Sequence, residues 1–128
     1  MSRRHRWAAT CLAFALHGCS DTPTDIVSSS GIVYGTVTNA AGAPIAGAQT
    51  VVDLYFETCP ATSNPLMASM TQSNAAGFYR LVVGALNLSG PRCIHVTVVA
   101  NGLSLVKEAT VGIQPQQRDS VRVDFTVR

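Results

Sequence analysis

Few side chains in this sequence could catalyse a reaction or hold a metal ion. The small number of histidines is the first indication. The chain has three, of which His5 and His17 lie in an amino-terminal segment that we expect to be removed, so His95 stands alone. A single histidine cannot form a histidine metal cluster, although it could serve in a Ser-His-acid triad. Because no Gly-x-Ser-x-Gly nucleophile motif occurs, we interpret His95 as a surface residue. We expect no catalytic residue, no metal site and no cofactor.

The carboxylates are also placed unfavourably for acid–base catalysis. Asp53 and Glu57 are four positions apart, which on a β-strand corresponds to about 13 Å. Most hydrolases that use a carboxylate pair need a shorter separation. The sequence contains neither a Gly-rich phosphate loop nor a calcium-loop pattern. We therefore expect the chain not to be an enzyme, with an envelope hydrolase that depends on His95 as the remaining catalytic alternative.

The amino terminus has the three parts of an export signal, which we place at residues 1–18. Arg3, Arg4 and Arg6 give it a positive start, and an apolar run follows at 7–16. This run is shorter than the roughly 20 apolar residues that cross a bilayer. A twin-arginine signal is an alternative, but Arg6 stands where that signal expects a large apolar residue.

The signal ends in a motif that resembles a lipobox, Leu16-His17-Gly18-Cys19. Leu16 and Gly18 fit the motif, whereas His17 replaces the usual small residue. We expect cleavage before Cys19, lipid on its sulfur and a flexible tether at 19–30, which is rich in serine and other polar residues. Ser20 after the cysteine favours sorting to the outer membrane. The alternative is ordinary secretion with Cys19 as a free thiol.

Two cysteines remain for the folded domain once the first two are assigned. Cys11 leaves with the signal and Cys19 carries lipid, which leaves Cys59 and Cys93 in a compartment that permits disulfides. A bond between them closes a loop that stabilises the domain by roughly 3–4 kcal/mol. Two reduced cysteines are the alternative. A zinc site is less favoured, because two cysteines and one histidine fall short of four ligands.

The composition favours one globular domain and argues against a nucleic-acid partner. The chain has 128 residues, of which 47% are hydrophobic and 12% charged. Three of its nine basic residues lie in the signal, and the remaining six are scattered singly among seven acidic residues. Binding to a phosphate backbone needs a concentrated basic face, which this distribution does not supply.

The rest of the chain alternates between strand-forming runs and turn residues, with no helical apolar repeat. Ile94, Val96 and Val98 alternate with His95 and Thr97, as in a half-buried strand. Asn101-Gly102 is typical of a two-residue hairpin. Seven such runs predict an all-β, antiparallel Greek-key sandwich over residues 31–128. The expected strands are 32–38, 48–56, 67–73, 78–83, 93–100, 103–111 and 120–127.

Four fragments in order resemble the carboxypeptidase regulatory-like domains, which have a transthyretin-like sandwich. They are Val33-x-Gly35-x-Val37, Gly42-x-Pro44-Ile45-x-Gly47-Ala48, Thr71 with Asn74-x-x-Gly77-x-Tyr79-x-Leu81, and Val96-x-Val98-x-Ala100-x-Gly102. The resemblance spans about residues 31–128 and implies an accessory or adhesion module without catalysis. Independently of the family, Gly35 inside a strand indicates a close backbone approach. Tyr79 on an apolar face indicates a buried ring whose hydroxyl reaches the backbone.

These observations predict a lipid-anchored envelope protein that works by contact with a protein or glycan. The leading expectation is an interaction module on the membrane. The alternative is a carbohydrate-binding module, for which Tyr34, Tyr55 and Phe78 are the rings available as sugar platforms. The only tryptophan, Trp7, lies in the signal.

Overall fold

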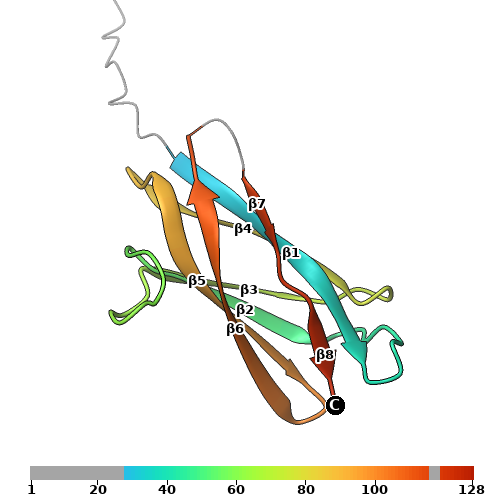
Figure 1. The fold of residues 1–128 in the computed structure, drawn as a ribbon. Coiled ribbons are helices and arrows are strands. Elements are labelled where there is room, and N and C mark those ends of the chain that lie inside the picture. The colour runs from blue at the N-terminus through green and yellow to red at the C-terminus, as the bar shows by residue number, and fades with distance from the viewer. Residues whose placement is uncertain (1–27, 116–118) are drawn as a thin grey trace, which may run out of the picture.

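The computed structural model describes residues 28–115 and 119–128 and folds them into strands and turns, without a helix in that part of the chain. Among those residues, none forms a helix long and apolar enough to cross a membrane. Eight strands follow one another (Figure 1): β1 (Ser28–Asn39), β2 (Gln49–Leu54), β3 (Met67–Gln72), β4 (Phe78–Leu86), β5 (Gly90–Ala100), β6 (Leu103–Ile113), β7 (Ser120–Arg122) and β8 (Phe125–Val127).

Two four-stranded sheets pack face to face, which confirms the predicted all-β sandwich. The β1 sheet has the order β4-β1-β7, with β8 also paired to β1, and the β5 sheet has the order β3-β2-β5-β6. The β1–β4 pair and all three pairs of the β5 sheet are antiparallel. The pairs β1–β7 and β1–β8 are parallel, where we expected antiparallel pairs throughout.

Strict alternation of side chains builds the core between the sheets. In β5, Ile94, Val96 and Val98 are fully buried, and in β1 the same holds for Val33 and Val37. Complete burial of such a side chain stabilises the fold by about 1.5–3 kcal/mol. The residues between them point outward, so both sheets present a second, solvent-facing surface.

Tyr79 and Gly35 bring the carboxy-terminal segment against β1. The sequence predicted a buried Tyr79 ring bonded to backbone and a close backbone approach at Gly35, and the structure confirms both. The Tyr79 ring is buried, its burial raises the pKa of its hydroxyl, and that hydroxyl donates a hydrogen bond to the Val123 carbonyl oxygen. A Cβ on Gly35 would lie 2.0 Å from the same oxygen. Val123 can pass this close to β1 only because position 35 has no side chain.

Three of the differences between the predicted and the observed strand boundaries bear on the site or on the packing of the sheets. The expected last strand is divided into β7 and β8, so there are eight strands rather than seven. The break falls at Val123 and Asp124, where the Asp124 carboxylate accepts the Thr36 backbone N–H at 2.8 Å. β1 begins at Ser28, inside the range expected for the tether. The expected strand 48–56 would have turned Phe56 inward with Leu54 and Tyr55 outward. β2 instead ends at Leu54, Tyr55 is buried and Phe56 is 62% exposed.

Candidate functional site

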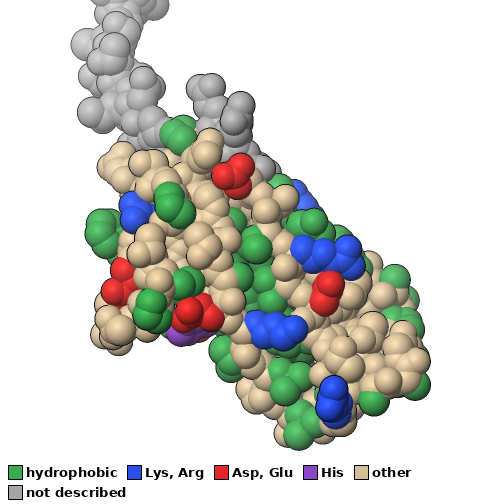
Figure 2. Space-filling view, viewed as in Figure 1, with side chains coloured by type: hydrophobic (Ala, Val, Ile, Leu, Met, Phe, Trp, Pro, Cys, Tyr) green, Lys and Arg blue, Asp and Glu red, His purple; other side chains and the backbone are tan. Residues whose placement is uncertain are grey.

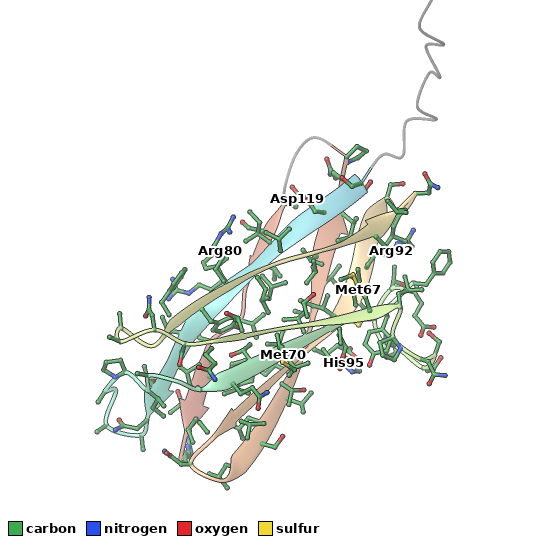
Figure 3. The ribbon with its side chains drawn as sticks, turned by 180° about the vertical axis from the view of Figure 1, so that it is seen from behind. Met67, Met70, Arg80, Arg92, His95 and Asp119 are labelled. Carbon is green, nitrogen blue, oxygen red and sulfur yellow. A yellow bond between two sulfur atoms is a disulfide. The ribbon has the colours of Figure 1, made fainter. Side chains whose placement is uncertain are left out.

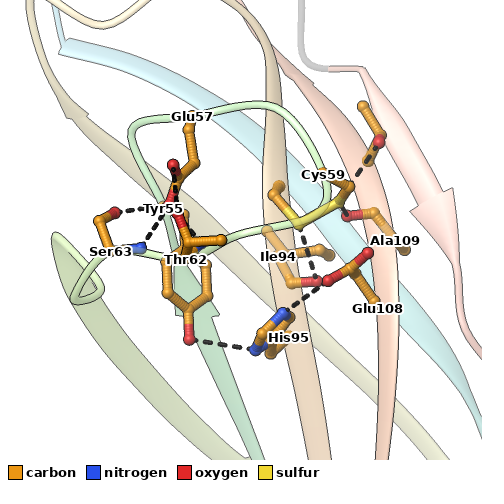
Figure 4. The surroundings of a disulfide bond; sticks show 11 residues. Tyr55, Glu57, Cys59, Thr62, Ser63, Ile94, His95, Glu108 and Ala109 are labelled. Carbon is orange, nitrogen blue, oxygen red and sulfur yellow. Dashed lines mark hydrogen bonds and ion pairs between the residues drawn. A yellow bond between two sulfur atoms is a disulfide. The ribbon is translucent and has the colours of Figure 1, made fainter.

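Tyr55, His95 and Glu108 form a hydrogen-bonded chain on the outer face of the β5 sheet (Figure 4). His95 on β5 lies opposite Glu108 on β6, with 2.8 Å between His95 Nε2 and Glu108 Oε2. The Tyr55 hydroxyl lies 3.1 Å from His95 Nδ1. Because a carboxylate can only accept, Nε2 carries the hydrogen, and Nδ1 of that tautomer accepts a hydrogen bond from the Tyr55 hydroxyl. His95 is therefore a partnered residue rather than the isolated surface histidine that we expected.

The charges around this chain favour a neutral tyrosine. The pKa of Tyr55 is raised by burial first and then by the nearby carboxylates of Asp53, Glu108 and Glu57. The order of groups matches that of a nucleophile, a base and an orienting acid. A tyrosine nucleophile, however, needs a lowered pKa, and its surroundings here do the opposite. The cluster is better suited to hold a positively charged group than to form a phenolate.

The predicted disulfide between Cys59 and Cys93 is confirmed and lies beside this cluster. It ties the loop after β2 to β5, together with backbone hydrogen bonds from Tyr55 to Cys93 and from Cys93 to Glu57. One oxygen of Glu108 and the two sulfur atoms lie within 4.8 Å of one another. Since each sulfur is bonded to the other, neither is a thiolate that could bind a metal.

Glu57 orders the loop that covers Tyr55. Its carboxylate accepts the backbone N–H groups of Thr62 and Ser63, both at 2.7 Å, and the Ser63 hydroxyl at 2.7 Å. These hydrogen bonds, led by that of the Ser63 side chain, lower the pKa of Glu57. The loop thus fixes a negative charge next to the Tyr55–His95–Glu108 chain.

Two parallel bands of side chains cross the outer face of the β5 sheet. Residues paired across neighbouring strands share a face, so Asp53, His95 and Glu108 form an acidic row. The neighbouring row, called the apolar row for its three apolar members, consists of Met70, Val51 and Val106 with Thr97 between the two valines. Met70 is 64% exposed and Val106 is 60% exposed. Figure 3 labels Met70 and His95, which lie near each other on this face.

The outer face of the β1 sheet has the opposite charge. Arg80 on β4, Tyr34 on β1 and Arg122 on β7 pair across the strands and form a basic row. Phe78 lies next to Tyr34 with 6.4 Å between the ring centroids. In Figure 2, most Lys and Arg side chains lie over the half of the molecule that holds β1, β7 and β8, with acidic side chains among them, and the histidine lies beside acidic side chains on the β5–β6 side.

An open groove of about 450 Å³ lies between the first residues of β1, the end of β4 and Met67 of β3. Its remaining lining residues are serine, glycine, alanine, valine and leucine. None of these side chains titrates near neutral pH, so they offer no acid–base chemistry.

The other predicted site residue, Cys19, lies outside the described residues. Glu108 was not among the predicted site residues, although its position could have been inferred, because it faces outward on the strand that the Asn101-Gly102 hairpin pairs with β5. Of the three rings considered as sugar platforms, Tyr55 is buried, Phe78 is 39% exposed and Tyr34 is partly exposed.

No family model and no curated protein matches the chain. Its fold is similar to that of solved dioxygenases. Chlorocatechol 1,2-dioxygenase from Pseudomonas putida has a TM-score of 0.56 at 15% identity, over 77% of this chain and 60% of that one. 3-Chlorocatechol 1,2-dioxygenase from Rhodococcus opacus 1CP has a TM-score of 0.54 at 13% identity, over 80% of this chain and 60% of that one. Hydroxyquinol 1,2-dioxygenase from Pseudomonas putida DLL-E4 has a TM-score of 0.53 at 13% identity, over 76% of this chain and 55% of that one.

These likenesses correct one expectation. We expected the chain not to be an enzyme, in part because its sandwich was taken as a type used for contact. The three solved proteins named above, which share this sandwich, are enzymes, so that expectation is wrong as an inference from the fold. The chain spans 60%, 60% and 55% of their lengths. At 13–15% identity, the likeness shows that the chain has their β-sandwich fold.

Proposed function

We propose that this chain is a lipid-anchored protein of the bacterial envelope whose sandwich binds a partner through the outer face of the β5 sheet. The observation that carries the proposal is the apolar row beside the acidic row, with Met70 and Val106 more than half exposed. Grouped apolar side chains on a solvent-facing sheet are typical of a contact surface. The flat face also offers charged groups that would fix the orientation of the partner.

The anchor is proposed from the amino-terminal sequence, with Cys19 as the lipidated residue and the outer membrane as the location. Bacterial lipoproteins carry more than one acyl chain, and more than one is needed for stable attachment. We expect Cys19→Ala to move the protein from the membrane fraction to the soluble fraction. Cys11→Ala, a matched change in the signal, leaves it on the membrane. Membrane retention of the Cys19 variant would exclude this anchor.

The contact surface is tested by a photo-crosslinking residue in living cells. Placed at Val106, in the apolar row, it should give one discrete adduct. Placed at Ala41, an exposed position in the turn after β1, it should give none. Equal adduct patterns at both positions would contradict the proposed surface. The adduct mass separates a second copy of this chain from any other partner.

A carbohydrate-binding module remains the second candidate, and one observation favours it. The rings of Tyr34 and Phe78 lie side by side on the β1 sheet, and Phe78 is partly open to solvent. Such a pair could stack against a sugar ring. Binding on a glycan array that Phe78→Ala abolishes would support this function over the first. As the family, we propose the carboxypeptidase regulatory-like domains, supported by the order of the four sequence fragments.

A further inference from the structure

The basic row and the acidic row have the same layout with opposite charge. Each row occupies three neighbouring strands, with a ring in the middle: Tyr34 between Arg80 and Arg122, and His95 between Asp53 and Glu108. Neighbouring strands lie about 4.8 Å apart, so the two charges in each row are separated by roughly 10 Å. The basic row of one molecule can therefore face the acidic row of another with each arginine opposite a carboxylate.

We propose that the partner of this protein is a second copy of the same chain, whose β1 sheet lies with its basic row on the acidic row of the β5 sheet. The inference rests on the proposed function, because it names the occupant of the same surface. Both arginines are exposed, and so is Glu108. The contact would place each guanidinium near a carboxylate, which steers association and selects the partner.

Apolar side chains next to each row complete the match. Beside the basic row lie Ile32 and Val82, of which Val82 is 40% exposed, and on its other side lies Phe78. Beside the acidic row lie Met70, Val51 and Val106. Their burial between two copies supplies the non-directional part of the affinity, and the charged rows supply the register.

Two of the four charged groups, Arg122 and Glu108, already have partners, and these contacts leave them available. Arg122 pairs with Asp124 at 2.9 Å, and Lys107 donates to the Asp124 backbone carbonyl. Glu108 pairs with His95 through Oε2. Exposed pairs of this kind contribute little free energy, so exchanging or sharing them with a neighbour costs little. Asp124 lowers the positive charge of the basic face but does not cancel it.

The arrangement is heterologous, since two different faces meet. Each pair of copies leaves one basic face and one acidic face free, so association continues into a row of copies instead of closing as a dimer. Copies that carry lipid on the same membrane meet at a high local concentration, which favours a weak contact. The proposal therefore predicts mass that rises steadily with concentration.

Paired charge reversals test the proposal directly. One variant carries Arg80→Glu with Arg122→Glu, and the other carries Asp53→Lys with Glu108→Lys. Each variant alone has two faces of the same sign and should associate at least about tenfold more weakly than the unmodified protein. An equimolar mixture places opposite charges across each contact again and should recover the association. The protein is purified after export with Cys19→Ala, and mass is followed by sedimentation.

Each outcome decides the question. Salt of about 0.5 M should weaken association of the unmodified protein, because it screens exposed charges. A matched control, Arg92→Glu, changes an arginine outside the basic row and should associate normally. An unmodified protein that stays monomeric, or a folded mixture that does not associate, overturns the inference. Circular dichroism verifies folding of each variant. If a Val106 adduct contains another protein, the contact function stands and only the second copy is excluded.

Discussion

Thr50 is the residue at which the interior departs most clearly from an apolar core. It lies on β2 with no exposed surface, and its Oγ1 has no hydrogen-bond partner among the described protein groups. A buried hydroxyl without a partner keeps the cost of leaving water and gains nothing in return. The position is occupied by a β-branched residue that suits a strand, so the shape is right while the polarity is not.

Replacement of Thr50 by valine should therefore stabilise the protein. Valine keeps the branched shape and removes the unpaired hydroxyl, which we expect to raise the free energy of unfolding by about 1 kcal/mol. Urea denaturation of both proteins measures the difference. Thr126→Val, at an exposed position of β8, is the control and should change little. A loss of stability in Thr50→Val would show that the hydroxyl has a partner.

Asp124 gives the fold a dependence on acid pH. Burial raises its pKa, but the Thr36 N–H and the Arg122 side chain outweigh this, and the net pKa is lowered. The folded pKa lies below the unfolded one, so the stabilisation is present above the unfolded pKa and is lost as the pH falls through the folded pKa. The Asp124→Asn protein should be less stable than the unmodified protein at neutral pH, and its stability should fall less as the pH is lowered. Thermal unfolding between neutral and strongly acid pH checks this, and parallel curves for the two proteins would contradict it.

At the scale of elements, strand alternation and hairpin chemistry could be predicted from the sequence. β5 alternates as expected, and Asn101 and Gly102 have the positive φ values, 51° and 74°, that their types allow. The boundary at Leu54 could not be predicted, because Tyr55 and Phe56 both suit a strand. Tyr55 is buried instead of Phe56 because the disulfide holds the loop after β2 against β5. That bond joins residues far apart in the sequence, so local residue types do not reveal its effect.

The break between β7 and β8 has the same origin. Val123 and Asp124 continue an alternating pattern, so local residue types favour one strand. The strand ends because Tyr79 and Thr36, more than forty positions away, bind the backbone of Val123 and the carboxylate of Asp124. The acidic row could not be predicted either, since its members are brought together only by the register of three strands. Cross-strand pairs depend on topology that the sequence pattern does not specify.

Gly35 is the position in β1 on which the approach of the β7–β8 segment depends. An alanine there would place its Cβ 2.0 Å from the Val123 carbonyl oxygen before relaxation, which is far shorter than a van der Waals contact. Backbone must then move, and we expect Gly35→Ala to lower the free energy of unfolding by roughly 1–3 kcal/mol or more. Denaturant titration measures the loss, with Ala41→Ser in an exposed turn as the control. Unchanged stability would show that β7 and β8 are displaced at no cost.

For the whole molecule, the disulfide joins the loop after β2 to the strand that carries the acidic row. It fixes the loop that buries Tyr55 and carries Glu57, and it ends next to the acidic row. Most of the sandwich is held by side chains buried between the sheets, whereas this edge depends on the covalent bond. Removal of the bond should therefore disturb the acidic face under conditions in which the sandwich stays folded.

The double variant Cys59→Ser with Cys93→Ser tests that separation. The bond joins residues 34 positions apart, and loop closure predicts a loss of roughly 3–4 kcal/mol in the free energy of unfolding. Below the unfolding transition, the strands should remain while amide exchange rises at the loop after β2 and at Tyr55, because these groups lose their tether. Hydrogen exchange with mass spectrometry resolves the two effects, and intact mass before and after reduction verifies the bond in the parent. If exchange rises equally in β1 and β4, the bond supports the sandwich as a whole and the acidic face has no separate dependence on it.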